Sequence, residues 1–365
     1  VAREIGLIMP QLPLLPAIGE IETKAVLKKV ARAHQALAEL KGVVAGIPNQ
    51  AILINTLALQ EAKDSSAIEN IITTQDQLYQ SDRNSAHYAS LAAKEVHTYA
   101  FALHTGFTEV LRQGLLTERL IIEMQQCIEE NNAGYRTQSG TVLKNQFGEI
   151  VYEPPQHTDD IIHYMRNLEQ FMNEDGLCDW DDLIKMAVIH HQFESIHPFY
   201  DGNGRTGRII NILYLVKQKL LDLPILYLSR YINKNKTQYY QLLQHVRDTQ
   251  KWEAWLLFML EAVEQTSMQT IHLIKQIRQL LHHHKTILRE QLPKIYSQDL
   301  INHMFCHPYT KIDFVVNELQ VTRQTASRYL DDIVAVGLLS KHKIGKDNFY
   351  INDDLFQLLS AVGEQ

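Results

Sequence analysis

The chain has 365 residues, of which 45% are hydrophobic and 21% are charged, and its formal net charge at pH 7 is −7. This composition excludes a disordered or fibrous protein, and the length favours two or three domains over one. A mildly acidic chain has no general attraction to nucleic-acid phosphates or anionic lipids, so nucleic-acid binding would need a local basic patch.

Cysteines and apolar runs bear on the cellular compartment. The three cysteines, Cys127, Cys178 and Cys306, lie far apart and form no C-x-x-C pair, which argues against a zinc knuckle or a redox motif and fits a reducing environment. No stretch approaches the roughly 20 apolar residues of a membrane-spanning helix, and no signal-peptide pattern is present. We therefore expect a cytoplasmic protein without membrane contact.

The first part of the chain predicts helices interrupted by one hairpin. The proline-rich residues 10–16 are expected to form an extended arm over the surface. Apolar residues recur at helical spacing over residues 21–128 and again from residue 159 to 292. Between them, residues 141–144 and 149–153 predict two short strands around a turn that contains Gly148.

The last 70 or so residues predict a different unit. Three short helices are expected over residues 297–305, 311–319 and 323–336, followed by two strands around a turn at 343–347, which is the winged variant of the helix-turn-helix unit. The expected fold class is thus mainly α, with a β-hairpin in a helical core and a C-terminal winged helix-turn-helix domain. The expected divisions are a helical N-terminal region (1–110), a core (111–265), a connecting helix (266–294) and the winged-helix domain (295–365).

The glycine-rich segment Gly202-Asn-Gly-Arg-Thr-Gly207 matches the pattern G-x-G-x-x-G, which is a weak signal on its own. A dinucleotide-binding loop would follow a buried strand, but residues 183–194 have helical spacing. A P-loop would need Gly-Lys followed by Ser or Thr, which is absent. Both common interpretations of a glycine loop are therefore excluded.

The residues of this segment instead predict an anion site. Gly202 and Gly204 allow consecutive backbone N–H groups to face an anion at close range. A helix that begins near Arg205 would add the positive end of its dipole. Arg205 and Arg208 lie three residues apart, on one helix face, and could bind the outer phosphates of a triphosphate. The alternative is an arginine pair on a solvated face.

Two residues before the glycines add reactive chemistry. Asp201 lies at the mouth of the loop, where its carboxylate could hold Mg²⁺ between phosphates. His197 has an ordinary pKa of about 6.5 and could accept a proton at neutral pH, although a His-Pro pair is also typical of a simple turn. A base, a metal ligand, an anion cradle and two cations together predict nucleotidyl or phosphoryl transfer.

The segment His197-Pro-Phe-Tyr-Asp-Gly-Asn-Gly-Arg-Thr-Gly-Arg208 resembles the Fic-domain signature, His-x-Phe-x-Asp/Glu-Gly-Asn-Gly-Arg-x-x-Arg, at every position. The resemblance implies an all-helical core that transfers AMP from ATP to a Ser, Thr or Tyr hydroxyl of a target protein. It implies that His197 deprotonates the hydroxyl, that Asp201 holds Mg²⁺ and that Phe199 anchors the loop. The ATP-binding residues that it implies are Gly202, Asn203, Gly204, Arg205, Thr206, Gly207, Arg208, Tyr239 and Tyr240.

Two further regions take roles from this resemblance. The hairpin at 141–153 is similar to the family's flap, which holds a segment of the target protein by strand addition, and the alternative is an ordinary surface hairpin. Tyr239 and Tyr240 fall where the family places a wall of the nucleoside site, although tyrosines at helical spacing are more often core residues. The stretch His245-Val-Arg-Asp offers no asparagine for adenine, so the base is less well defined than the triphosphate.

Upstream, Ser65-Ser-Ala-Ile-Glu-Asn70 is similar to the family's inhibitory motif, Ser/Thr-x-x-x-Glu-Gly/Asn. The similarity implies an inhibitory helix near residues 65–80, in which Glu69 pairs with Arg208 and leaves ATP in an unproductive pose. The alternative is a capping box in which Ser66 and Glu69 begin a helix. The same carboxylate could also support removal of AMP from a modified protein.

The predicted winged unit could bind DNA through residues 322–328, or bind protein. Residues 295–365 carry six basic and nine acidic side chains, which is weak support for a phosphate-binding face. We therefore favour a protein-interaction or homodimerisation role over DNA binding. Of the other histidines, His190 and His191 with Glu194 lack the spacing of a zinc protease and predict core packing, and the run at 282–284 predicts a solvated patch.

Two other functions compete with AMP transfer. One is a transcriptional regulator whose Fic-like core senses a nucleotide, but a sensor needs neither the base His197 nor the metal ligand Asp201. The other is a Fic relative with a different donor, such as phosphocholine, but Arg205 and Arg208 favour a triphosphate.

Overall fold

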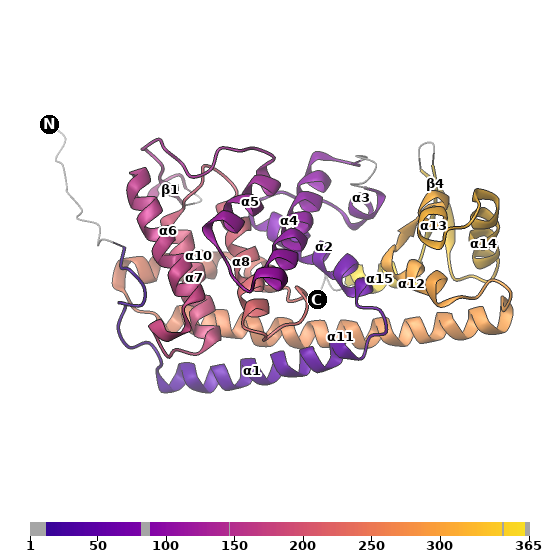
Figure 1. Cartoon of the computed structure of the whole chain (residues 1–365), viewed down its shortest axis with the longest axis horizontal. Coiled ribbons are helices and arrows are strands. Elements are labelled where there is room, and N and C mark those ends of the chain that lie inside the picture. The colour runs from indigo at the N-terminus through magenta and orange to yellow at the C-terminus, as the bar shows by residue number, and fades with distance from the viewer. Residues whose placement is uncertain (1–11, 82–87, 146, 345–346, 362–365) are drawn as a thin grey trace. The chain divides into compact units, whose positions relative to one another are not determined.

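The structure is a computed structural model that describes residues 12–81, 88–145, 147–344 and 347–361. It confirms the predicted mainly helical fold class (Figure 1). The chain forms two compact units, the first made of residues 1–35, 101–222 and 231–264, the second of residues 36–100, 223–230 and 265–365. The division into four continuous segments that the sequence predicts differs from these two units, and it stays a prediction.

Four helices contribute residues to both units: α1 (Lys24–Ala45), α4 (Leu91–Gln113), α9 (Leu228–Lys234) and α11 (Glu253–Gln291). The other elements of the first unit are α5 (Glu118–Glu129), β1 (Leu143–Lys144), β2 (Ile150–Tyr152), α6 (Thr158–Asn173), the 3₁₀ turn η1 (Asp175–Leu177), α7 (Asp182–Ile196), α8 (Asn203–Lys217) and α10 (Lys236–Thr249). In the part of the chain that the structure describes, no helix is both long and apolar enough to cross a membrane.

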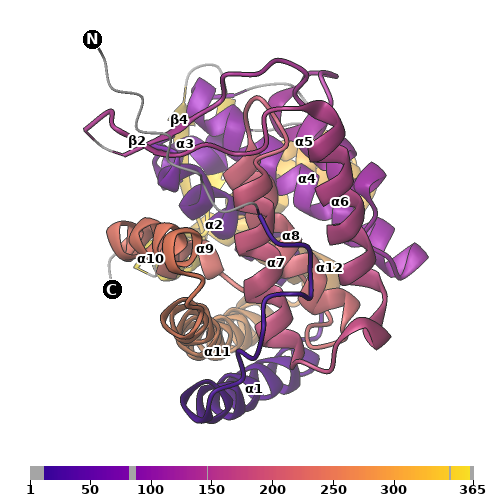
Figure 2. The ribbon, with the colours of Figure 1, turned by 90° about the vertical axis from the view of Figure 1, so that its left-hand side faces the viewer.

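Helix α7 lies at the centre of the first unit. Every residue from Leu183 to Ile196 is buried, so this helix is covered on all faces rather than along one stripe. Helix α7 packs against α6 on one side and α8 on the other, and α5 packs against α8 (Figure 2). Residues 197–202 connect α7 with α8, so two buried helices fix both ends of this loop.

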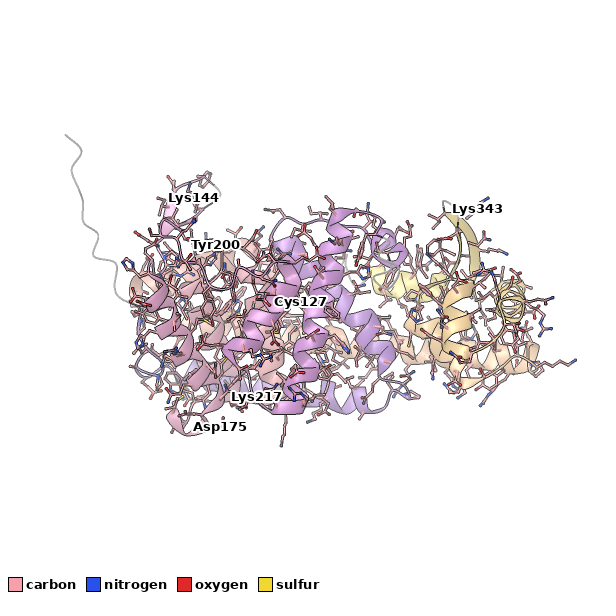
Figure 3. The ribbon with its side chains drawn as sticks, turned by 45° about the horizontal axis from the view of Figure 1, so that its top comes forward. Cys127, Lys144, Asp175, Tyr200, Lys217 and Lys343 are labelled. Carbon is pink, nitrogen blue, oxygen red and sulfur yellow. The ribbon has the colours of Figure 1, made fainter. Side chains whose placement is uncertain are left out.

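The predicted hairpin is present. Strands β1 and β2 pair antiparallel, with Leu143 opposite Tyr152 and Lys144 opposite Ile150. Gly148 has φ +79°, a left-handed conformation that suits glycine in the turn. Lys144 lies where this hairpin projects from the helices of the unit (Figure 3).

The predicted arm is anchored to the first unit, but residues 15–18 form a turn rather than an extended segment. Leu15 is buried, and its backbone forms two hydrogen bonds with the side chain of Asn167 on α6. The N–H of Leu15 donates to Asn167 at 2.8 Å, and the carbonyl of Leu15 accepts from Asn167 at 2.9 Å. Gln192 on α7 donates to the carbonyl of Pro13 at 2.8 Å. Pro10 and Gln11 of the predicted arm lie outside the described residues.

The second unit contains α2 (Ala51–Ile68), α3 (Gln75–Gln80), α12 (Gln298–Cys306), β3 (Tyr309–Thr310), α13 (Ile312–Leu319), α14 (Arg323–Ala335), β4 (Ser340–Ile344), β5 (Asp347–Ile351) and α15 (Asp353–Ala361). Three helices followed by a hairpin lie where the sequence predicted them, and Lys343 lies near the tip of that hairpin (Figure 3). Strand β3 completes an antiparallel sheet in the order β3-β5-β4. Neither β3 nor α15 was predicted.

The chain around Glu69 differs from the prediction of a helix near 65–80. Helix α2 ends at Ile68, because Asn70 adopts φ +63° and the N–H groups of Asn70 and Ile71 bond back to the carbonyls of Ala67 and Ser66 in a Schellman motif. The alternative capping box at Ser66 and Glu69 is therefore wrong, since Ser66 lies in the last turn of a helix. The capping box in this region is formed by residues 74 and 77 at the start of α3.

The histidine run at 282–284 is not uniformly solvated. His282 and His283 are exposed, but His284 is fully buried and contacts Phe305 edge-on, with ring centroids 5.3 Å apart. Burial lowers the pKa of His284. The prediction of a solvated patch is wrong for His284 because successive helical residues face different directions.

Candidate active site

The 197–202 loop leaves one buried helix and enters another through two left-handed residues. His197 follows α7 with φ 49° and ψ 59°, and Gly202 precedes α8 with φ 77° and ψ 5°. A left-handed conformation costs a non-glycine residue about 1–2 kcal/mol, and such residues are concentrated at functional sites. The conformation of His197 turns the chain out of the path of α7.

Arg136 holds the beginning of this loop. Its side chain is 1% exposed, and its Nε donates to the carbonyl of His197 at 2.8 Å. Its Nη2 bonds the carbonyl of Pro155 and lies 3.4 Å from that of Ile196, while its backbone N–H donates to Pro198 at 2.9 Å. Burial lowers the pKa of Arg136. Sequence reasoning missed this residue, since nothing in its local pattern indicates that it contacts a loop 61 positions later.

Asn203 closes the loop on itself. Its side-chain oxygen accepts from the N–H of Phe199 at 2.9 Å, and its side-chain nitrogen donates to the carbonyl of Phe199 at 2.8 Å. Phe199 is fully buried next to Tyr135 and Phe193, as the anchoring role requires. Because the amide of Asn203 is used within the loop, its contribution to an anion site would come from its backbone N–H.

The N-terminus of α8 has no side-chain cap. Several other helices begin with a side chain that accepts from their first turn, namely Thr74, Thr117, Asp181, Ser297 and Thr322. At α8 the cap position is Gly202, and the first helical bond is the one from Thr206 to Gly202, at 2.9 Å. The N–H groups of residues 203–205 thus have no acceptor within the helix, which is the arrangement that binds anions.

Arg205 is paired with Glu129 of α5. Their Nη2 and Oε1 atoms are 2.6 Å apart, and the side chains are 5% and 15% exposed. Glu129 also borders the loop, because a Cβ placed on Gly202 would lie 2.7 Å from the same oxygen. Arg208 is 1% exposed. The structure therefore brings Arg205 and Gly202 together around a carboxylate that sequence reasoning missed.

Asp201 fits the role of a magnesium ligand. Its side chain is exposed, and its Oδ1 accepts from the N–H of Gly202 at 2.7 Å. Gln125 of α5 donates to the backbone carbonyl of Asp201 at 3.2 Å and holds it beside the uncapped helix. Mg²⁺ in proteins usually takes one or two carboxylates together with substrate phosphates, so a single exposed carboxylate beside a phosphate cradle suits it.

Tyr200 connects the loop with the chain that leads into the hairpin. It is 49% exposed, and its hydroxyl accepts from the N–H groups of Thr137 at 2.9 Å and Gln138 at 3.3 Å (Figure 3). The hydroxyl of Thr137 lies 3.1 Å from the same oxygen, and this contact, together with the backbone hydrogen bonds, lowers the pKa of Tyr200. The loop thus contacts the hairpin's connecting segment through an exposed aromatic side chain.

Thr206 and Gly207 pack against neighbouring helices, and their predicted contact with ATP stays a prediction. Thr206 is fully buried, and a Cβ on Gly207 would lie 3.0 Å from both Phe193 and Glu194 of α7. Glycine at 207 therefore allows α8 to approach α7 closely. Neither residue offers a side chain to a ligand.

His190 and His191 pack in the core, as the sequence indicated. His190 is fully buried, contacts the hydroxyl of Tyr239 at 2.8 Å and lies parallel to Trp255, with ring centroids 6.0 Å apart. Burial, and secondarily the charge of Arg208, lowers the pKa of His190 to about 3, so the ring is neutral. Burial also lowers the pKa of His191, whose Nε2 lies 3.2 Å from a backbone carbonyl.

The same contact corrects the assignment of Tyr239. This side chain is 1% exposed and its hydroxyl is engaged by His190, so it belongs to the core rather than to the wall of a nucleoside site. Its neighbour Tyr240 is 44% exposed and keeps an accessible ring. Glu69 lies in the second unit and is exposed at the end of α2, and its pairing with Arg208 stays a prediction.

Sequence profiles cover the chain in three consecutive matches. The profile described as the Fic/DOC family matches residues 115–215, which contain α7, the 197–202 loop and most of α8. The chain belongs to the Fic family. The Fic/DOC family N-terminal profile matches residues 27–108, and the profile of the C-terminal domain of SoFic-like protein adenylyltransferases matches residues 280–355.

Curated relatives share short segments of this Fic protein. A probable protein adenylyltransferase of Aquifex aeolicus is 32% identical over 102 residues, which are 27% of this chain and 29% of that protein. The protein adenylyltransferase fic-1 of Caenorhabditis elegans is 25% identical over 63 residues, which are 17% of this chain and 12% of that protein. The matched segments thus span less than a third of either relative.

Solved structures extend the likeness to the whole fold. A Fic family protein from Desulfovibrio desulfuricans superposes with a TM-score of 0.59 and 18% identity, over 91% of this chain and 97% of that one. A Fic domain-containing signaling protein from Bacteroides thetaiotaomicron gives a TM-score of 0.51 and 16% identity, over 69% and 97%. These similarities show the Fic fold for this chain.

Proposed function

We propose that this Fic protein transfers AMP from ATP to a hydroxyl group of a target protein. The observation that carries the proposal is the 197–202 loop, which places a histidine at the end of α7 and an exposed carboxylate at the uncapped start of α8. The names of its relatives, which are protein adenylyltransferases, support the same reaction class.

The reaction needs one proton acceptor and one anion site. His197 takes the proton of the target hydroxyl, and the oxygen attacks the α-phosphorus of ATP. A new oxygen–phosphorus bond forms, the bond to the bridging oxygen breaks, and pyrophosphate leaves with that electron pair. The N–H groups of Asn203 and Gly204 at the start of α8 stabilise the charge that develops on the α-phosphate.

The other loop residues bind the outer phosphates. Arg205 would exchange its contact with Glu129 for a phosphate, and Arg208 would take the γ-phosphate. Asp201 would hold Mg²⁺, which neutralises part of the phosphate charge when it is bound. This assignment agrees with the exposed position of Asp201 beside Gly202.

The hairpin of β1 and β2 is the proposed binding surface for the target protein. Ile150 and Phe147 on this hairpin are 62% and 77% exposed, so both apolar side chains are accessible to a partner. A target segment in extended conformation could add to a strand edge here and present its hydroxyl to the loop.

Substitution of the base tests the reaction. His197→Ala should abolish AMP transfer while ATP still binds, because a base acts in the chemical step and contributes little to ground-state affinity. Transfer is measured with labelled ATP and binding by calorimetry. His245→Ala, which removes an exposed histidine of α10, should leave both unchanged. Retained transfer in His197→Ala would refute the assignment.

We further propose that Glu69 inhibits the enzyme, as the motif at 65–70 implies. The Schellman end of α2 supports this use of the motif, because it explains why Gly or Asn must follow the glutamate: residue 70 has φ +63°. The same turn leaves Glu69 exposed at the helix end, where its carboxylate can contact a partner group.

Removal of this carboxylate tests the inhibition. Glu69→Gly should raise AMP incorporation at least severalfold over the parent protein. The matched control is Glu174→Gly, because Glu174 is also an exposed glutamate at the C-cap of a helix, α6. An equal rise in both variants, or no rise with Glu69→Gly, would refute a specific inhibitory role.

For the C-terminal part we propose a protein-interaction or homodimerisation role rather than DNA binding. Three of its basic side chains are already paired with acidic ones: Arg323 with Asp313, Lys341 with Asp331 and Lys311 with Asp347. Such pairs reduce the positive charge that a DNA backbone would meet. The expected cytoplasmic location stays a prediction from the wide spacing of the three cysteines.

A further inference from the structure

Two histidines and a glutamate meet in the second unit, and the proposed reaction uses none of them. His303 lies in the last turns of α12, His307 directly follows that helix, and Glu318 lies in the last turn of α13. His303 Nδ1 is 2.6 Å from one carboxylate oxygen of Glu318, and His307 Nε2 is 2.5 Å from the other. All three ligand atoms lie within 4.8 Å of one another.

The arrangement of the two rings is that of a metal-binding pair. Residues four apart lie on one face of a helix, so His303 and His307 direct nitrogens to one point, with ring centroids 4.9 Å apart. Zn²⁺ binds histidine nitrogen and carboxylate oxygen at about 2.0–2.2 Å, which places neighbouring ligand atoms about 3.3 Å apart in a tetrahedral site. Shifts of about an ångström would bring the three donors to that geometry.

Thr310 on β3 orients the first histidine. Its hydroxyl lies 2.6 Å from His303 Nε2 and donates to the carbonyl of Lys311 at 3.5 Å, so it can accept from an Nε2–H. Both Thr310 and His303 are buried. Metal-binding histidines usually donate their other ring N–H to a neighbouring acceptor in this way, which leaves the first nitrogen free to bind the ion.

The two ring nitrogens and the carboxylate of Glu318 converge on one point, where a metal ion could bind all three donors. The partial exposure of His307 and Glu318, whose side chains are 27% and 45% exposed, gives an ion a path to the site.

We propose that His303, His307 and Glu318 form a three-ligand site for Zn²⁺ or a similar transition-metal ion that links α12 to α13. Two imidazoles and one carboxylate suit zinc better than Mg²⁺ or Ca²⁺, which prefer oxygen ligands. Three protein ligands leave a fourth position for water or for a side chain of a binding partner.

The test uses the full chain, stripped of metal with a chelator and titrated with Zn²⁺ by calorimetry. We expect one zinc equivalent whose affinity falls at least tenfold in His307→Gln and in Glu318→Gln. His282→Gln, which removes an exposed histidine of α11, should bind zinc like the parent protein. Mg²⁺ in excess should not compete for the site.

Two further readouts separate a bound metal from a structural hydrogen-bond network. Co²⁺ in a four-coordinate site absorbs strongly in the visible range, so the parent chain should show this band and His307→Gln should lose it. Circular dichroism checks that the variants remain folded, and His307 is only partly buried, so its variant is the safer one. Equal zinc affinity in parent and variants, or no zinc binding by the parent, would overturn the proposal.

Discussion

Gly202 combines a left-handed conformation with close approach to Glu129. A Cβ there would lie 2.7 Å from Glu129 Oε1, and φ is +77°. Gly202→Ala should therefore cost about 1 kcal/mol of backbone strain and also displace the partner of Arg205. We expect a lower melting temperature and at least severalfold weaker ATP binding.

A control for Gly202→Ala separates the effect of the contact with Glu129 from the effect of backbone strain. Gly114 has φ +71° but no atom within 4 Å of its added Cβ, so Gly114→Ala introduces strain alone. It should lose stability without losing ATP affinity. If both variants bind ATP equally well, the contact with Glu129 has no part in forming the site.

The ion pair of Arg205 and Glu129 allows a test of the phosphate role. Glu129→Ala should destabilise the fold by about 3 kcal/mol, because it removes a partner from a buried guanidinium. The phosphates of ATP would replace that carboxylate, so Mg-ATP should raise the melting temperature of Glu129→Ala more than that of the parent. Glu123→Ala, which breaks an exposed pair with Arg119, is the control. A smaller ligand shift in Glu129→Ala would contradict the role.

His190 makes the stability of the first unit depend on pH. Its folded pKa of about 3 lies below the unfolded value of about 6.5, so the fold favours the neutral ring. Its contribution is complete above about pH 6.5 and is lost as the pH falls from there towards 3. All three tryptophans, Trp180, Trp252 and Trp255, lie in this unit, and Trp255 stacks on His190.

Urea denaturation followed by tryptophan fluorescence measures this effect. We expect the midpoint to fall between about pH 7.5 and pH 5, and to fall less in His190→Asn. The effect persists in part in that variant because His191 is buried and neutral as well. A midpoint independent of pH in the parent would show that burial does not hold these rings neutral.

At the scale of elements, Arg136 connects the end of α7 with the chain before α6. It touches no proposed substrate atom, so it is a positioning residue for His197. Arg136→Ala should lower kcat with little change in the KM for ATP, and should cost about 2–3 kcal/mol of stability because buried carbonyls lose their donor. Arg136→Lys should not restore kcat, since it lacks the forked geometry.

The matched control is Arg119→Ala. The side chain of Arg119 is 88% exposed, so its removal should change the free energy of unfolding by less than about 0.5 kcal/mol. If Arg136→Ala raised the KM for ATP by the same factor as it lowered kcat, the result would point to general loosening of the loop.

Elements with a strong local pattern were predictable, and elements defined by distant contacts were not. Helices α12, α13 and α14 show helical spacing and were expected within two residues of their ends. Strand β3 has only two residues and exists because it pairs with β5, about 40 positions later, which no local pattern indicates. The end of α2 was not predicted, because the helix near 65–80 was expected from similarity to the inhibitory motif, whereas the left-handed conformation of Asn70 ends α2 at Ile68.

The candidate site shows the same division. His197, Asp201 and the start of α8 could be predicted because they are adjacent in sequence. Glu129 and Arg136 reach the loop only through the packing of α5 and of the segment before the hairpin. The buried position of Tyr239 also depends on tertiary contacts, because helical spacing alone does not show which face is covered.

At the scale of the whole molecule, different units supply different parts of the proposed activity. The 197–202 loop, the hairpin and Arg205 belong to the first unit, whereas Glu69 and the His303 cluster belong to the second. Helices α1, α4 and α11 contribute residues to both.

The most direct measurement follows separate labels on ATP with the Glu69→Gly form of the full chain. Label on the α-phosphate should become fixed to protein, in greater amount than with the parent, and should disappear when His197→Ala is added to the same variant. Label on the γ-phosphate should leave with pyrophosphate. Protein labelled by the γ-phosphate and not by the α-phosphate would show phosphoryl transfer and would contradict AMP transfer by this loop.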